Sequence, residues 1–256
     1  MRIGHRSANL GLPMMEAIDA AGEIGYEGVA LLARAGWVDP AELGPARMAE
    51  IRERCARAGV EVSALTGNFG SLIDEGADDR VPWCLSVLEA AAKLEVPLVT
   101  SHIGAIPEDL TGTEVRAMME RVGRLCARAE ELGVTIGVET GPEEGWVLRD
   151  FIEALGSPRL RVNYDPANLL MKGFDHMGGV EVLGPYIVHT HPKDAVREDP
   201  GGRRQRALGE GDVDIARWIA ELRRVGFDGW LCVERESGDD KLGDARRGLE
   251  LLRALI

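Results

Sequence analysis

The chain has 256 residues, of which 45% are hydrophobic and 29% are charged, so it can bury a sizeable core. Its formal net charge is −13, and such an acidic surface repels phosphate backbones, which argues against nucleic acid as a partner. No apolar run reaches the ~18 residues that cross a membrane, and the four cysteines show no Cys-x-x-Cys spacing, so we expect a cytoplasmic protein with reduced thiols.

Short β-like runs alternate with amphipathic helical runs along the whole chain. We expect strands at 2–6, 28–33, 60–66, 97–102, 134–140, 160–165, 186–191 and 229–234. Apolar residues spaced by three and four predict helices at 13–24, 45–58, 81–94, 114–132, 214–225 and 244–256. This alternation predicts a single-domain (β/α)8 TIM barrel over residues 1–256. An open doubly wound sheet is the alternative, but the Gly-x-Gly-x-x-Gly turn that usually follows its first strand is absent.

Two connections, residues 66–79 and 194–214, are longer than an ordinary strand-to-helix loop. Long loops in compact domains are uncommon and often functional, and both follow a strand, which places them on the C-terminal face. A disordered insertion or a plain surface loop is the alternative. The second loop holds Arg203, Arg204 and Arg206, which either capture a phosphate or carboxylate or are simply solvated. We expect this loop to be mobile when the site is empty and to close over a ligand.

Side-chain alternation selects the inward face of the last four strands. In a barrel the apolar set must face the helices, so the polar set points inward. Each polar set ends in one metal-capable residue at the C-terminal end of its strand, where TIM barrels place their sites: Glu139, Asp165, His191 and Glu234. Taken alone, a glutamate or aspartate at a strand end is more often paired with an arginine or lysine, and a histidine is more often a satisfied core residue. Three converging buried carboxylates, however, are untenable without a cation, so the sequence predicts a metal site.

The composition of this set indicates which cation it prefers. Three carboxylates and one imidazole favour a hard or intermediate ion, so Mn²⁺, Mg²⁺ or Co²⁺ fit best, with Zn²⁺ as a further option. Four ligands leave about two positions of an octahedral shell, and two adjacent oxygens of a substrate would fill them.

Other polar residues near these strand ends are candidates to bind substrate. His189 shares the inward parity of His191, and we expect His5 and His102 to point inward as well. Each of these histidines is otherwise a core residue or a support for a ligand. Trp146 follows the fifth strand and either forms a wall of the substrate site or packs in the ordinary way.

Five motifs distinguish the second half of the chain: GVETGP (137–142), NYDPANL (163–169), HTHPKDA (189–195), LGEGDVD (208–214) and VERESGDD (233–240). With them, the whole chain resembles the xylose isomerase-like TIM-barrel superfamily, and within it the sugar phosphate isomerase/epimerase branch. The resemblance implies that one divalent metal is bound by the same four residues that parity selects. The motifs define a fold and a site rather than a substrate.

The resemblance also implies roles in the chemistry. Ketose 3-epimerases of the superfamily use two glutamates as acid and base on either face of the substrate, and these roles would fall on Glu139 and Glu234. Lys193 of the His-x-Lys-Asp motif would face the substrate; the alternative is an ion pair with Asp194 or a neighbouring acid. Asn168 stands where epimerases often have histidine, and it can bind a hydroxyl but cannot carry a proton.

We therefore expect a metal-dependent isomerase or epimerase of a small carbohydrate, phosphorylated or not, that transfers protons through a metal-stabilised enediolate. A lyase or dehydratase of a keto-sugar or related polyol is the alternative, because elimination starts from the same enediolate. An endonuclease IV-like repair enzyme is disfavoured, because Asn68 and Asn168 replace expected histidines. A non-catalytic sugar-binding barrel is disfavoured by the intact ligand set. The substrate, the native metal and the oligomeric state, a homo-oligomer included, stay open.

Overall fold

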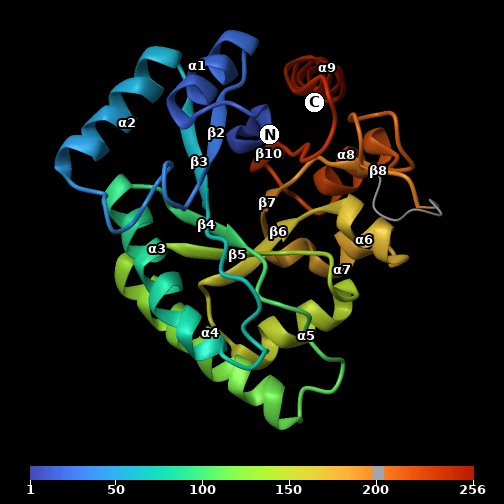
Figure 1. Ribbon diagram of the computed structural model, residues 1–256. Coiled ribbons are helices and arrows are strands. Elements are labelled where there is room, and N and C mark those ends of the chain that lie inside the picture. The colour runs from blue at the N-terminus through green and yellow to red at the C-terminus, as the bar shows by residue number, and fades with distance from the viewer. Residues whose placement is uncertain (198–204) are drawn as a thin grey trace.

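The computed structural model describes residues 1–197 and 205–256. Eight parallel strands close a barrel in the order β1-β10-β7-β6-β5-β4-β3-β2 (Figure 1). The barrel strands are β1 (Arg2–Arg6), β2 (Gly28–Leu32), β3 (Glu61–Thr66), β4 (Leu98–Ser101), β5 (Thr135–Glu139), β6 (Leu160–Tyr164), β7 (Ile187–Thr190) and β10 (Trp230–Val233). The prediction of a (β/α)8 barrel is confirmed, and the open sheet is excluded because β1 pairs with β10.

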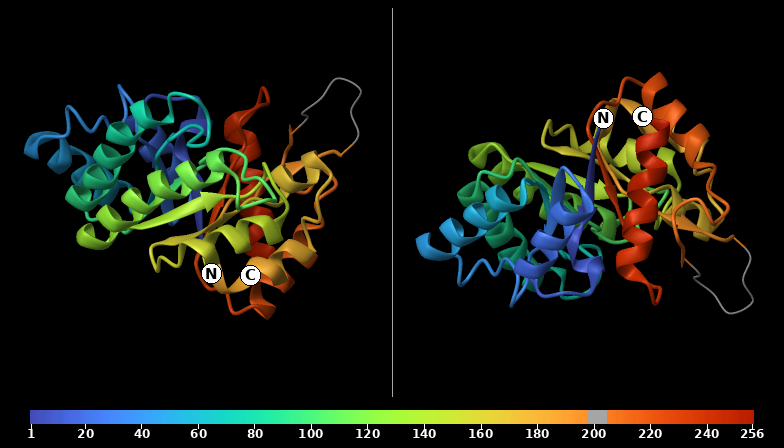
Figure 2. Two further views of the ribbon diagram at one scale, coloured as in Figure 1. Left: turned by 90° about the horizontal axis from the view of Figure 1, so that it is seen from below. Right: turned by 90° about the horizontal axis from the view of Figure 1, so that it is seen from above.

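Helices surround the barrel on its outside (Figures 1 and 2). They are α1 (Met14–Ile24), α2 (Pro45–Ala58), α3 (Val81–Leu94), α4 (Thr113–Leu132), α5 (Gly145–Leu155), α6 (Pro166–Lys172), α7 (Gly178–Leu183), α8 (Ile215–Arg224) and α9 (Lys241–Leu255). Short 3-10 turns are η1 (Ser7–Leu10), η2 (Ala77–Arg80) and η3 (Gly184–Tyr186). The six helices placed from the sequence begin and end within three residues of the observed bounds.

Helix α8 illustrates why these segments become helical. The side chain of Asp214 caps its start by accepting a hydrogen bond of 3.0 Å from the Arg217 amide. One face is apolar at a spacing of three and four residues, and its side chains are all buried: Ile215, Trp218, Ile219 and Leu222. Burial of that stripe against the barrel stabilises the helix more than its intrinsic propensity does.

Two kinds of core fill the molecule. The large one lies between the barrel and its helices. A small one fills the inside of the barrel and consists of Ala30, Ala64, Leu98 and Cys232. Cys232 lies two residues before Glu234 on the same face of its strand, so the apolar filling gives way to charge only at the C-terminal strand ends. All four cysteines are buried free thiols.

The two ends of the chain lie side by side, as all three views show (Figures 1 and 2). The pairing of β1 with β10 brings them together, with Gly4 opposite Cys232, and the amino group of Met1 forms an ion pair with Asp228. Within residues 1–197 and 205–256, no helix combines the length and apolarity that a membrane crossing requires.

The two long connections take different forms. In residues 66–79 the side chains of Phe69 and Leu72 are buried, and the Phe69 amide donates a hydrogen bond of 2.9 Å to Ser101 Oγ. The connection after β7 contains an antiparallel hairpin of β8 (Asp194–Ala195) and β9 (Gln205–Arg206). Residues 198–204, with Arg203 and Arg204, lie outside the described residues, so the closure of this loop over a ligand stays a prediction.

Candidate metal centre

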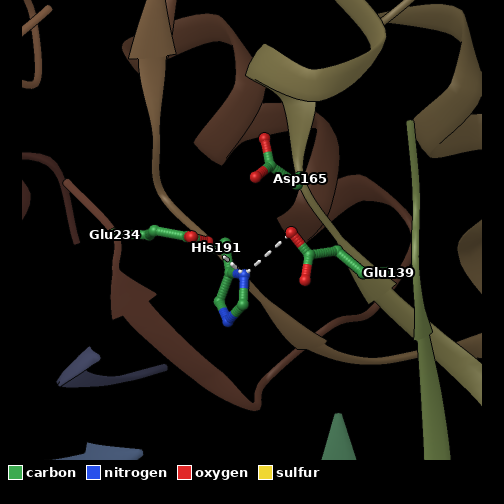
Figure 3. A group of neighbouring side chains, drawn as sticks. All are labelled: Glu139, Asp165, His191 and Glu234. Carbon is green, nitrogen blue, oxygen red and sulfur yellow. Dashed lines mark ion pairs between the residues drawn. The ribbon is translucent and has the colours of Figure 1, made fainter. Parts of the chain in front are cut away.

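Four side chains with metal-ligating atoms meet at the C-terminal end of the barrel. They are Glu139, Asp165, His191 and Glu234, and one ligand atom of each lies within 4.8 Å of the others. Glu139 is the last residue of β5, and the other three directly follow β6, β7 and β10. All four are buried, and Figure 3 shows their side chains pointing toward one another. The alternation of side chains along the strands accounts for this convergence.

The contacts within this group suit a cation. His191 Nδ1 lies 2.6 Å from Glu234 Oε2 and 3.4 Å from Glu139 Oε1 (Figure 3). Asp165 Oδ1 caps α6 by accepting the Asn168 amide at 2.9 Å, whereas buried Asp165 Oδ2 has the Lys193 ammonium at 3.4 Å but accepts no hydrogen bond from the described residues. A buried carboxylate oxygen without a donor is unfavourable. A divalent ion would satisfy it, so the residues present fit a metal.

The carboxylates of the group differ in proton affinity. Burial raises the pKa of Asp165 to about 7, although Lys193 opposes the shift. Burial acts in the same direction on Glu139, but the charges of His102 and His191 outweigh it and lower the pKa of Glu139 to about 2. Burial also opposes ionisation of Glu234, but the charges of Arg6, Lys193 and His191 outweigh it and hold the pKa of Glu234 well below its usual range, so both glutamates are ionised and can accept a proton.

Two buried cations border the acids on one side. Arg6, the last residue of β1, forms an ion pair with Glu234 and lies 3.4 Å from Glu236 Oε1. Lys193 Nζ lies 3.4 Å from Asp165 Oδ2, 3.7 Å from Glu234 Oε1 and 3.3 Å from Glu236 Oε2. The sequence reasoning missed Arg6 and Glu236. Arg6 was detectable as a charged residue at the C-terminal end of a strand.

The expectation that His5 points into the barrel is wrong. Arg6 takes the inward direction, so His5 points outward, where its ring centroid lies 5.0 Å from that of Tyr26. Tyr26 in turn donates a hydrogen bond of 2.6 Å to the carbonyl of Ala245 on α9. Burial among these groups lowers the pKa of His5 to about 4. A polar residue thus occupies the helix-facing side of β1, which misleads a parity rule based on apolar side chains.

Asn168 and His102 contact Glu139 from two sides. Asn168 Nδ2 donates a hydrogen bond of 2.9 Å to Glu139 Oε1, and His102 Nε2 lies 3.5 Å from the same oxygen. Asn168 also accepts a hydrogen bond of 3.1 Å from Lys193 Nζ. Gly141 permits this arrangement, because its φ is 145° and a Cβ there would lie 2.6 Å from Asn168 Cβ.

His189 lies beneath the group rather than in it. Its Nδ1 is 2.9 Å from Asn163 Oδ1, and Asn163 Nδ2 is 3.2 Å from His191 Nδ1. Both Asn163 and His189 are fully buried. The Asn163 amide therefore connects the two histidines and restricts the orientation of the His191 ring.

Asp194 is not the partner of Lys193. Its carboxylate accepts four backbone N–H groups at 2.8–3.1 Å, from Ala195, Gly209, Gly211 and Val213. A Cβ at Gly211 would lie 2.2 Å from Asp194 Oδ1, so this close approach requires glycine. The motifs HTHPKDA and LGEGDVD are thereby joined, which fixes the end of the loop after β7.

A cavity of 540 Å³ lies above the acidic group, which suits a ligand of sugar size. It is lined by Arg6, Thr66, Asn68, Gly70, Ser101, His102, Glu139, Gly141, Pro142, Asn168, Met171, Lys172, Lys193, Gln205, Glu234 and Glu236. The lining includes Lys193, His102 and Asn168, three of the residues expected to bind substrate. It does not include His5, His189 or Arg206, nor Trp146, which is 39% exposed on α5.

Comparisons with known proteins agree with this architecture. A family model described as xylose isomerase-like TIM barrel matches residues 18–255. An uncharacterized protein of Methanocaldococcus jannaschii is 24% identical over 182 residues, which cover 66% of this chain but only 59% of that protein. The 2-epi-5-epi-valiolone 7-phosphate 2-epimerase of an Actinoplanes species is 27% identical over 232 residues, which cover 87% of this chain and 82% of the enzyme. A xylose isomerase domain protein from Planctomyces limnophilus has a similar crystal structure, with a TM-score of 0.85, 25% identity and coverage of 93% and 91%.

Proposed function

The chain belongs to the xylose isomerase-like TIM-barrel family, and from that premise we propose that it is a metal-dependent isomerase or epimerase of a sugar or sugar phosphate. The observation that carries the proposal is the convergence of three carboxylates and one imidazole beneath a cavity of sugar size. The similarity to a 2-epi-5-epi-valiolone 7-phosphate 2-epimerase supports the class of reaction. The substrate itself is left open.

In this proposal, Glu139, Asp165, His191 and Glu234 hold one divalent ion, with Mn²⁺, Mg²⁺ or Co²⁺ favoured and Zn²⁺ as a further option. When bound, such an ion would polarise the adjacent hydroxyl and carbonyl oxygens of a substrate and stabilise negative charge on them. The four residues are buried, and interactions between charges are stronger there than in bulk water.

The two glutamates are the proposed proton carriers. Of the four residues, only Glu139 and Glu234 line the cavity, so they are the two placed best to reach a bound substrate. They project from β5 and β10, which are not neighbours in the barrel, and so approach the cavity from different directions. One would remove a proton from the carbon beside the carbonyl, and the other would return a proton to the opposite face.

Three other lining residues are assigned to substrate binding. Lys193, Asn168 and His102 form a continuous set of donors around Glu139, with contacts of 2.9–3.5 Å between them. They can donate hydrogen bonds to hydroxyl or carbonyl oxygens of a sugar. His189 and His5, which do not line the cavity, are assigned supporting positions instead.

The test is a screen of keto-sugars, phosphorylated and free, in D₂O with Mn²⁺ added. We expect deuterium to enter the carbon next to the carbonyl of the true substrate, followed by formation of an isomer or epimer. The matched control is His191→Ala, which should lose exchange because the metal is lost. An elimination product would establish the lyase reaction instead. Equal exchange by the wild-type protein and His191→Ala would contradict the proposal.

A further inference from the structure

Glu236 is a fourth acid beside the site, and its position is fixed from several directions. Its carboxylate lies 3.3 Å from Lys193 Nζ and 3.4 Å from Arg6 Nη1, and it accepts a hydrogen bond of 2.6 Å from Gln205 Nε2. Gln205 Oε1 accepts the Glu236 amide in return, at 2.9 Å. This two-point contact with β9 holds the carboxylate in the cavity wall, although its side chain is 49% exposed.

Without Glu236, the groups around it would form a binding site for an oxyanion. Lys193 and Arg6 keep only 4% and 17% of their side-chain surface exposed, so both charges are poorly hydrated. An ammonium, a guanidinium and the Gln205 amide would then converge on one point of the cavity. Such a combination binds phosphate and carboxylate groups strongly. We call these three residues the cationic corner.

The charges of the site explain why Glu236 is needed. Three carboxylates would face a divalent ion and the two cations of the corner, which leaves one positive charge in excess. The carboxylate of Glu236 cancels that excess. A site with an uncompensated positive charge at low solvent exposure would attract any small anion. With Glu236 present, an incoming anion would meet a carboxylate at the position where it would bind.

We propose that Glu236 is a specificity-determining residue, which bars phosphate and carboxylate groups from the cationic corner of Arg6, Lys193 and Gln205. The part of the substrate that lies beside this corner is therefore uncharged, as in a free polyhydroxy ketone. Selection works here by repulsion of the wrong ligand rather than by attraction of the right one. The substrate class rests on the proposed function, whereas the exclusion of anions from the corner is testable without it.

The first experiment titrates sulfate into the Mg²⁺-loaded protein by calorimetry. Glu236→Gln keeps the shape and a hydrogen bond to Gln205 but removes the charge. We expect this variant to bind one sulfate per chain at least tenfold more tightly than the wild-type protein. Glu210→Gln, an exposed glutamate that does not line the cavity, is the matched control and should behave as wild type. The double variant Lys193→Met/Glu236→Gln should lose this tighter binding of sulfate, because one cation of the corner is removed.

The second experiment measures deuterium exchange into D-fructose, its 1-phosphate and its 6-phosphate. If Glu236 selects by charge, Glu236→Gln should lower the preference for the free sugar over at least one phosphate by tenfold or more. Sulfate binding that is equal in the wild-type protein and Glu236→Gln would overturn the proposal, and so would an unchanged preference for both phosphates. If none of these three sugars exchanges, the sugar and its phosphates are taken from the screen that tests the proposed function, and the sulfate titration decides the role of Glu236 by itself.

Discussion

The rim of the cavity has two chemically different sides. The acidic side lies at the ends of β5, β6, β7 and β10, where Glu139 and Glu234 line the cavity and Asp165 and His191 lie beneath it. The neutral side lies at the ends of β3 and β4 and consists of Thr66, Asn68 and Ser101. Both sides occupy the same level of one closed barrel. The strand architecture is therefore shared, and the chemistry is decided by which residues occupy equivalent strand ends.

Hydrogen bonding differs between the two sides. On the neutral side, Ser101 Oγ donates to the carbonyl of His102 and accepts the amide of Phe69, both at 2.9 Å, so it organises its own loop. Both sides hold buried oxygens without a hydrogen bond among the described residues, such as Thr66 Oγ1 and Asp165 Oδ2, but only the carboxylate oxygen carries charge. We infer that the neutral side forms a wall, whereas the acidic side performs the chemistry. The following predictions test this division.

The largest effect is expected from the two glutamates of the acidic side. Glu139→Gln and Glu234→Gln keep the shape and an oxygen ligand but remove the base, so each should lower turnover at least ~10²-fold while metal still binds. One variant should still exchange deuterium without completing the reaction, because proton removal survives when only its return is lost. Steady-state rates and exchange measured by NMR check this. Near-normal turnover in both variants would move proton transfer to Lys193 or His102.

A hydrogen bond that connects the acidic side with the neutral side should make the free energy of unfolding depend on pH. Glu143, after β5, accepts the Ile106 amide of the loop after β4 at 3.1 Å, and burial raises its pKa from 4.5 to about 7. The folded state therefore binds this proton more tightly than the unfolded state. Its contribution to stability is complete below pH 4.5 and is lost as the pH rises through about 7.

Glu143→Gln stays neutral and keeps an acceptor for the Ile106 amide. Its stability relative to the wild-type protein should therefore rise with pH, by up to about 3 kcal/mol above neutral pH. Urea denaturation of both proteins over this pH range measures the difference in their free energies of unfolding. The acidic side titrates in both proteins alike, so its contribution cancels in that difference. Glu144→Gln is the adjacent control. A difference that does not change with pH would show that Glu143 is not protonated in the fold.

A moderate effect is expected from the layer beneath the acidic side. Asn163→Leu removes the amide that orients His191, and metal affinity should fall about tenfold to a hundredfold. Thr100→Val is the control, because Thr100 Oγ1 is buried inside the barrel and has no hydrogen-bond partner among the described residues. Calorimetric titration with Mn²⁺ compares the two. Unchanged affinity in Asn163→Leu would mean that the carboxylates alone position the ion.

The smallest effect is expected on the neutral side. Ser101→Ala removes neutral hydrogen bonds from the wall, which is worth about 1 kcal/mol, or roughly a fivefold change in kcat/KM. Its effect should appear mainly in KM, because the wall contacts the substrate without moving protons. A hundredfold loss of kcat in Ser101→Ala would contradict the division between the two sides, because it would show that the neutral side takes part in the chemistry.

Much of the fold and the core of the site were predictable because they depend on regular strands. Glu139, Asp165, His191 and Glu234 lie at the ends of strands whose other face is mostly apolar, so parity predicts that they lie together. Arg6 and His5 escaped this reasoning, because β1 carries polar residues on both faces. His189 has the right parity but lies one layer below the cavity.

Glu236 could not have been placed by any periodic pattern. It lies beyond the end of β10, and its position depends on Gln205, which is 31 residues away in the chain. Contacts between loops of this kind follow from tertiary packing rather than from local sequence. The specificity proposed for Glu236 is therefore visible only once the loops are placed in space.

The most direct test of the division between the acidic and neutral sides is a titration of metal-free protein with Mn²⁺. The electron paramagnetic resonance signal of the free ion reports how much Mn²⁺ is bound. The account predicts one tight site per chain in the wild-type protein and in Ser101→Ala, and loss of that site in His191→Ala and Asp165→Ala. Absence of tight binding in the wild-type protein, or equal binding in His191→Ala, would contradict it.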